Sequence, residues 1–192
     1  MTRALRRTLA ALIVALAFGM LAALVKGDQA GLRDTIGNLS TPWLLVAFGA
    51  GRLTRSLPRG ALLGLAATVL ALLGFYLVVA VITDDAMPTL HEHLEHVLRV
   101  NRRWLISGLL SGPLFGALGA WARRLPRRAA LVIVGLLLIV EPFVIGAVQA
   151  VPGGRQIVHW SLHPGPYVAE IVAGLAVLLL ARRRRAAEQV GH

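Results

Sequence analysis

Two glutamates lie within or beside long apolar stretches of the chain, where an ionisable side chain could do chemistry. Glu141 is followed by Pro142, and Glu170 lies near the start of the last apolar stretch. An ionisable group in lipid is costly, so it usually faces the protein interior or a cavity. The pair suits a site for a cation, a proton or a polar solute. Alternatively, each carboxyl is protonated, or is paired with an arginine or a helix amide.

Histidines and glutamates form a second cluster. His91, His93 and His96 lie in one polar segment, and His159 and His163 lie in a later one. Imidazole and carboxylate groups suit zinc, nickel or copper, but the zinc motif His-Glu-x-x-His is absent. A short amphipathic helix at the membrane surface explains the first segment equally well, because its apolar residues follow helical spacing. The histidines are therefore either metal ligands or a solvated, pH-responsive face.

Other enzyme signatures are missing from the sequence. There is no glycine-rich phosphate loop with a lysine, no Gly-x-Ser-x-Gly elbow and no pair of intramembrane aspartates. The chain has no cysteine, which excludes disulfides, thiolate metal sites and cysteine nucleophiles. We therefore expect a protein that is not an enzyme and needs no cofactor. A metal-dependent membrane enzyme is the exception that the histidines leave open.

Small residues recur at four-residue intervals in the fourth apolar stretch. Gly108, Gly112, Gly116 and Ala120 would share one face of a helix, and the first apolar stretch carries a similar stripe. Small residues let another helix backbone approach closely. The spacing favours a helix-packing face within the protein, and the alternative is a face that docks a separate membrane subunit.

Membrane-spanning helices are expected to carry these residues. The chain is 57% hydrophobic and only 15% charged, whereas a soluble domain carries about 25% charged residues. A helix needs about 20 apolar residues to cross a bilayer core. We predict an all-α membrane protein, a single integral membrane domain over residues 1–185 with a short cytoplasmic tail at 186–192. The six predicted transmembrane helices are at residues 9–25, 36–51, 60–82, 104–120, 129–151 and 166–181.

Arginines set the predicted orientation. With the N-terminus inside, 14 of the 20 basic residues fall in inner segments, as the positive-inside rule requires. Both termini are therefore expected in the cytoplasm, at a bacterial inner membrane. The net charge of +11 does not indicate nucleic acid, because the basic residues stand at the ends of apolar runs. Anionic lipids at the inner face are the expected partner.

Two basic turns between the predicted spans resemble each other. Residues 55–61 match residues 123–129 at five of seven positions. Both turns follow an inward span and precede an outward one, so the match indicates a parallel repeat that pairs spans two and three with spans four and five. The alternative is that short cytoplasmic turns commonly draw on Arg, Pro and Ala.

Several segments carry a resemblance to known families. On Trp43 to Gly51, Trp104 to Arg124, Glu141-Pro142 and Tyr167 to Gly174, the chain resembles a family of uncharacterised actinobacterial multi-pass membrane proteins. That resemblance implies a fold and a membrane location but no activity. The run from Gly112 to Gly119 is similar to the substrate-binding membrane subunits of energy-coupling-factor vitamin transporters, which also have six helices and small-residue docking stripes.

Two functions follow as expectations. The first is a small-solute binding or transport subunit, with its pocket near Glu141 and Glu170 toward the outer face. The second is a non-catalytic scaffold that packs its glycine face against another membrane protein or a second copy of itself. The sequence does not identify the solute or the partner.

Overall fold

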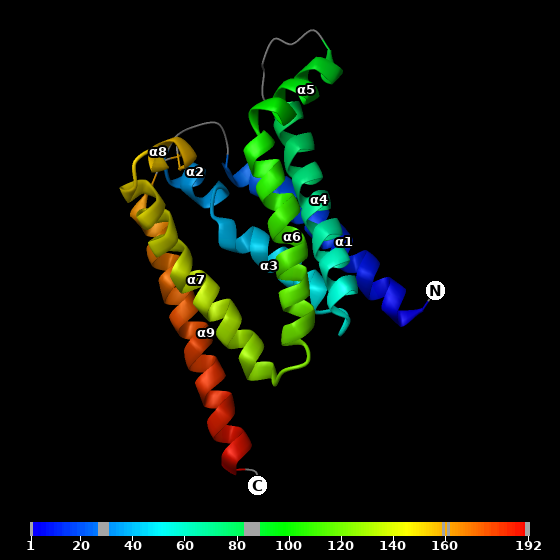
Figure 1. The fold of residues 1–192 in the computed structure, drawn as a ribbon, viewed down its shortest axis with the longest axis vertical. Coiled ribbons are helices and arrows are strands. Elements are labelled where there is room, and N and C mark those ends of the chain that lie inside the picture. Colours follow the sequence, from blue (N-terminus) through cyan, green and yellow to red (C-terminus); the bar gives the residue numbers. More distant parts are fainter. Residues whose placement is uncertain (1, 27–30, 83–88, 159, 161, 191–192) are drawn as a thin grey trace.

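The computed structural model describes residues 2–26, 31–82, 89–158, 160 and 162–190. Over these residues the chain is helical and contains no strand (Figure 1). The helices in chain order are α1 (Arg3–Lys26), α2 (Leu32–Gly37), α3 (Ser40–Gly51), α4 (Leu57–Ile82), α5 (Leu90–Val100), α6 (Arg102–Ala122), α7 (Arg127–Ala150), α8 (Gly154–Ile157) and α9 (Pro164–Val190).

Five helices in the described part of the chain are long and apolar enough to cross a membrane. They are α1, α4, α6, α7 and α9; four of them contain a predicted span in full, and α7 ends one residue before the predicted span at 129–151 does. A helix satisfies its own main-chain N–H and C=O groups, which lipid cannot do. The predicted all-α architecture is confirmed, and the five apolar helices identify a membrane protein.

The predicted span at residues 36–51 does not form a helix of membrane length. Instead, α2 ends at Gly37, and α3 begins at Ser40 with only 12 residues. Twelve helical residues rise about 18 Å, against a bilayer core of about 30 Å. Pro42 is tolerated because it lies in the first turn, where main-chain N–H groups have no partner within the helix. A short helix therefore stands where hydropathy predicted a sixth span.

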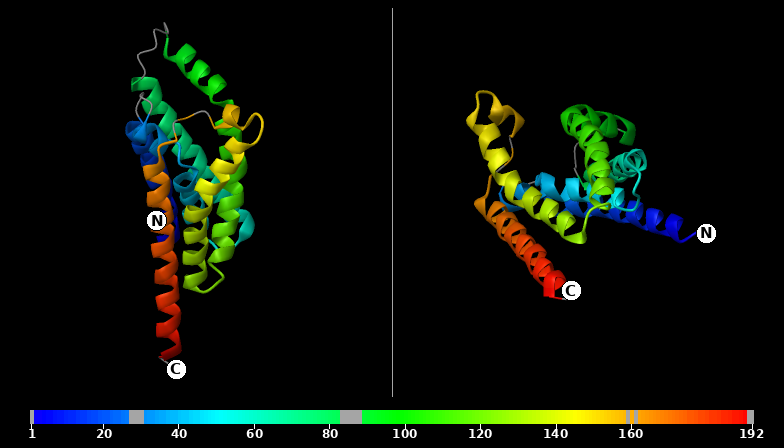
Figure 2. Two further views of the ribbon diagram at one scale, coloured as in Figure 1. Left: turned by 90° about the vertical axis from the view of Figure 1, so that its left-hand side faces the viewer. Right: turned by 60° about the horizontal axis from the view of Figure 1, so that its bottom comes forward.

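The helices form two groups. In the first group α4 packs on α1, α3 and α6, and α3 packs on α6; in the second, α7 packs along α9. The α7–α9 hairpin diverges from the first group, as the right-hand view of Figure 2 shows. The short helices α2, α5 and α8 lie at one end of the molecule, and the basic turns at 52–56 and 123–126 lie at the other (Figure 1). Contacts of α3 and α6 with α7, and of α2 with α9, join the two groups.

The two similar basic turns lie against each other. Arg123 donates hydrogen bonds from Nη1 to the carbonyl oxygens of Arg52, at 2.9 Å, and of Leu53. Arg124 donates from Nε and Nη2 to the carbonyl oxygen of Arg55, at 2.9 and 2.7 Å. These carbonyls follow the end of α3, where the helix leaves acceptors unpaired. The arginines of the second turn thus provide hydrogen-bond donors for the main-chain carbonyls of the first turn.

Candidate functional site

Glu141 of α7 caps the N-terminus of the short helix α3. Its Oε1 accepts a hydrogen bond from the main-chain N–H of Ser40, and its Oε2 accepts one from that of Thr41, both at 2.5 Å. These N–H groups belong to the first turn of α3, where the helix provides no acceptor and its dipole is positive. Glu141 is only 8% exposed. A buried acid from residue 141 therefore satisfies a helix end about 100 residues earlier in the chain.

A second hydrogen bond joins the same two helices. The hydroxyl of Thr41 donates to the carbonyl oxygen of Leu137 at 3.3 Å, and Thr41 is 1% exposed. Main-chain groups left unpaired at membrane depth are tolerated only where protein covers and satisfies them. The contact between α3 and α7 both covers these main-chain groups and gives them hydrogen-bond partners. The start of α3 can therefore lie inside the protein rather than at its surface.

Glu170 of α9 lies beside Glu141 but has a different environment. It is 6% exposed, and within the described part of the chain neither of its carboxylate oxygens has a hydrogen-bond partner. The Glu141 carboxyl is close enough to interact with it electrostatically and, if one of the two groups carries a proton, to hydrogen-bond to it. Buried polar atoms almost always have a partner, so the two free oxygens of Glu170 require an explanation.

Close packing of α7 on α9 brings the two glutamates together. A Cβ built on Gly174 would lie 2.7 Å from the carbonyl oxygen of Gly135, so only glycine allows this approach. The two helices run in opposite directions (Figure 1). Glu141 is six residues after Gly135 and Glu170 is four residues before Gly174, which corresponds to about 9 and 6 Å along the two helices. The glycine contact therefore sets the two acids at similar heights.

Aromatic side chains lie close to the two acids. The indole Nε1–H of Trp160 donates to the hydroxyl of Tyr167 at 3.3 Å, and the rings of Trp160 and Trp104 have centroids 5.3 Å apart. Tyr167 is half-buried, and its hydroxyl is within electrostatic range of Glu141 and Glu170. Sequence reasoning did not include Tyr167 in the site, although its position three residues before Glu170 would have placed both on one helix face.

The histidines do not form a cluster in the described part of the chain. His91 and His96 are exposed on α5, while the side chain of His93 and the whole of His159 lie outside the described residues. The main-chain N–H of His163 donates to the hydroxyl of Thr35 at 3.0 Å, and its Nδ1 accepts a hydrogen bond from Gly165 at 3.2 Å. No three described His, Asp or Glu side chains could hold a metal ion together.

The predicted helix-packing face of α6 is covered by α4. Cβ atoms built on Gly108 and Gly112 would lie 2.9 Å from a methyl group of Leu72 and 2.7 Å from the hydroxyl of Thr68. One built on Gly116 would overlap the carbonyl oxygen of Gly60, and Ala120, which continues the face, is fully buried. Because the chain itself fills this face, a separate subunit cannot dock on it without displacing α4.

Comparison with known proteins identifies one family. The model of DUF6518, described as a family of unknown function, matches residues 1–190. This confirms the resemblance to an uncharacterised family. Comparisons with curated proteins and with solved structures find no match.

Proposed function

We propose that this chain, which belongs to the DUF6518 family of unknown function, binds a proton or a small cation at Glu170 within the membrane. It acts as a solute-binding or transport subunit rather than as an enzyme. One observation carries the proposal. Both carboxylate oxygens of Glu170 are buried without a main-chain, hydroxyl or amide donor among the described residues, and the group beside them is the second carboxyl, Glu141.

The oxygens of Glu141 already accept the main-chain N–H groups of Ser40 and Thr41, so Glu141 can hydrogen-bond to Glu170 only when a proton lies between the two carboxyl groups. Two negative charges side by side in a low-dielectric interior repel each other strongly, and neither is solvated by lipid. A proton or a cation bound at Glu170 removes the repulsion and occupies the free oxygens. Intramembrane acids with this arrangement commonly belong to ion or proton pathways.

The position of Glu170 also favours a route from the nearer end of the molecule. Glu170 lies six residues after the start of α9 at Pro164, which is about 9 Å along the helix. The half-buried Tyr167 lies one turn closer to that end and hydrogen-bonds to Trp160. An entering ion would pass this aromatic pair before it reaches the carboxyl groups.

Replacing Glu170 with glutamine is expected to remove the dependence of stability on cations. The wild-type protein, purified in detergent, should show a Tm that rises with one ion of a panel, namely Na⁺, Li⁺, K⁺ or choline at constant ionic strength, or with added protons. A ligand present at 100 times its Kd stabilises the folded state by about 2.7 kcal/mol. Thermal unfolding curves recorded across the panel would measure the response.

E170Q should give one Tm under all of these conditions, because the amide neither binds a cation nor takes up a proton in this range. The matched control is E92Q, which neutralises an exposed glutamate of α5 and should respond as the wild type does. If E170Q and the wild type respond alike, or neither responds, Glu170 is a structural carboxyl and the proposal is wrong.

The proposal includes a topology of six crossings in a bacterial cytoplasmic membrane, with both termini in the cytoplasm. In this topology α3, together with the residues before it, completes the second crossing. The alternating directions of α1, α3, α4, α6, α7 and α9 support it (Figure 1). The positive-inside rule supports the orientation, because both basic turns lie at the end opposite α2, α5 and α8.

Single cysteines test this topology directly, because the chain has none of its own. We expect Q156C, at an exposed position of α8, to react with a membrane-impermeant maleimide in intact spheroplasts. T2C, at the exposed N-terminus, should react only after lysis. The reverse pattern would show that the orientation is inverted, and labelling of both positions in intact spheroplasts would show that the N-terminus is not cytoplasmic.

A further inference from the structure

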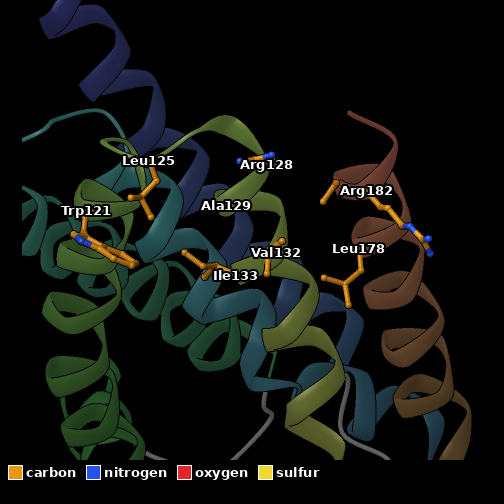
Figure 3. A pocket seen from close by; sticks show the side chains of 9 residues that line it. Trp121, Leu125, Arg128, Ala129, Val132, Ile133, Leu178 and Arg182 are labelled. Carbon is orange, nitrogen blue, oxygen red and sulfur yellow. The ribbon is translucent and has the colours of Figure 1, made fainter. Parts of the chain in front are cut away.

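An apolar groove lies between α6, α7 and α9 at the end of the molecule that carries the basic turns. Its volume is about 620 Å³, within the range of about 300–1,000 Å³ typical of small-molecule sites. Trp121 of α6, Val132 and Ile133 of α7 and Leu178 of α9 line it (Figure 3). The groove exists because α7 diverges from α6 after the turn that joins them.

Two arginines line the same groove at one end. Arg128 lies at the start of α7, and Arg182 lies on α9, where its guanidinium group points away from Arg128 and would reach the groove in another rotamer (Figure 3). Arg128 is half-buried and Arg182 is exposed. The ion pairs among the described residues join Lys26 to Asp34 and Arg99 to Glu95. Within that part of the chain, neither groove arginine therefore has a carboxylate partner.

The depth of these arginines matches that of lipid headgroups. The apolar spans of α7 and α9 run over Arg128–Ala150 and Pro164–Arg183, so Arg128 and Arg182 stand at the polar ends of both spans. A guanidinium group binds a phosphate oxyanion through paired, charge-assisted hydrogen bonds. The groove therefore combines an apolar channel at membrane depth with two cations at its polar end that no described carboxylate neutralises.

We propose that this groove binds an anionic phospholipid, with its phosphate at Arg128 and Arg182 and an acyl chain along Val132, Ile133 and Leu178. An acyl chain has apolar surroundings both in the groove and in the bilayer, so moving it into the groove gains little. The headgroup therefore decides which lipid binds. Each arginine near the surface contributes roughly fivefold to the affinity for an anionic lipid, and the pair contributes about thirtyfold.

Native mass spectrometry of the full chain tests the proposal with two probes, phosphatidylglycerol and phosphatidylcholine of identical acyl chains. We expect one phosphatidylglycerol to bind the wild type in preference to phosphatidylcholine. The double variant R128Q/R182Q should lose about thirtyfold in affinity for phosphatidylglycerol. The variant R128K/R182K should recover part of this loss, because it restores the charge without the planar guanidinium group.

The matched control is R55Q/R59Q, which removes two exposed arginine side chains from the other basic turn and should keep the wild-type preference. Brominated phosphatidylglycerol gives a second measurement, because it should quench tryptophan fluorescence in the wild type more than in W121F. Equal binding of both lipids, an equal loss in the control, or a second protein copy bound in place of lipid would overturn the proposal.

Discussion

Replacing Glu141 with leucine is expected to destabilise the protein more than any other single change to its polar groups. The change leaves the main-chain N–H groups of Ser40 and Thr41 buried without their acceptors. Each unsatisfied buried group costs about 1–3 kcal/mol, so the loss is on the order of 2–6 kcal/mol. For a chain of this length that corresponds to a fall in Tm of roughly 10 °C, measurable by thermal unfolding in detergent.

Two variants test whether stability depends on capping by Glu141 or only on the presence of a buried acid. E141Q keeps one acceptor oxygen and should lose about half as much stability as E141L. E170Q removes a buried carboxyl that accepts no hydrogen bond from a described N–H or hydroxyl group, so without the stabilising ion it should not lower Tm. If E141L unfolds at the wild-type temperature, the carboxyl does not hold the start of α3.

The capping contact explains why hydropathy alone did not predict the short helix α3. Residues 36–51 are apolar enough to be interpreted as a span, and Ser40, Thr41 and Pro42 were visible only as an interruption at its start. These residue types also fit the first turn of a helix, which is where the structure has them. The partner that makes such a start tolerable within a membrane protein is Glu141, about 100 residues away, and local sequence patterns cannot supply a contact of that range.

The two acids themselves could be singled out from the sequence, because charge is rare within apolar stretches. The different roles of the two acids could not be predicted from the sequence. Glu141 accepts hydrogen bonds from α3, while Glu170 has a second carboxyl beside it and no described N–H or hydroxyl donor, and this difference depends on how α7 and α9 pack at Gly135 and Gly174. Helical spacing alone likewise suggested a histidine cluster, but spacing on one helix does not bring ligands from other segments together.

Replacing Gly51 with alanine is expected to produce a large loss of stability from the addition of one methyl group. Gly51 lies near the end of α3, and a Cβ there would overlap the carbonyl oxygen of Gly116 on α6. Main-chain atoms cannot rotate away as a side chain can, so α3 and α6 would have to separate. Overpacking of this kind typically costs about 1–3 kcal/mol, and sometimes more. Thermal unfolding of G51A should therefore show a Tm several degrees below that of the wild type.

Gly49 provides the control on the same helix. It is exposed, and a Cβ built on it would meet nothing within 4 Å. Alanine exceeds glycine in helix propensity by up to about 1 kcal/mol, so G49A should keep or slightly raise Tm. The two variants differ only in what the new methyl group meets. An equal fall in both would mean that α3 tolerates no added side chain, whereas an unchanged Tm in G51A would mean that α3 and α6 do not approach as closely as their glycines allow.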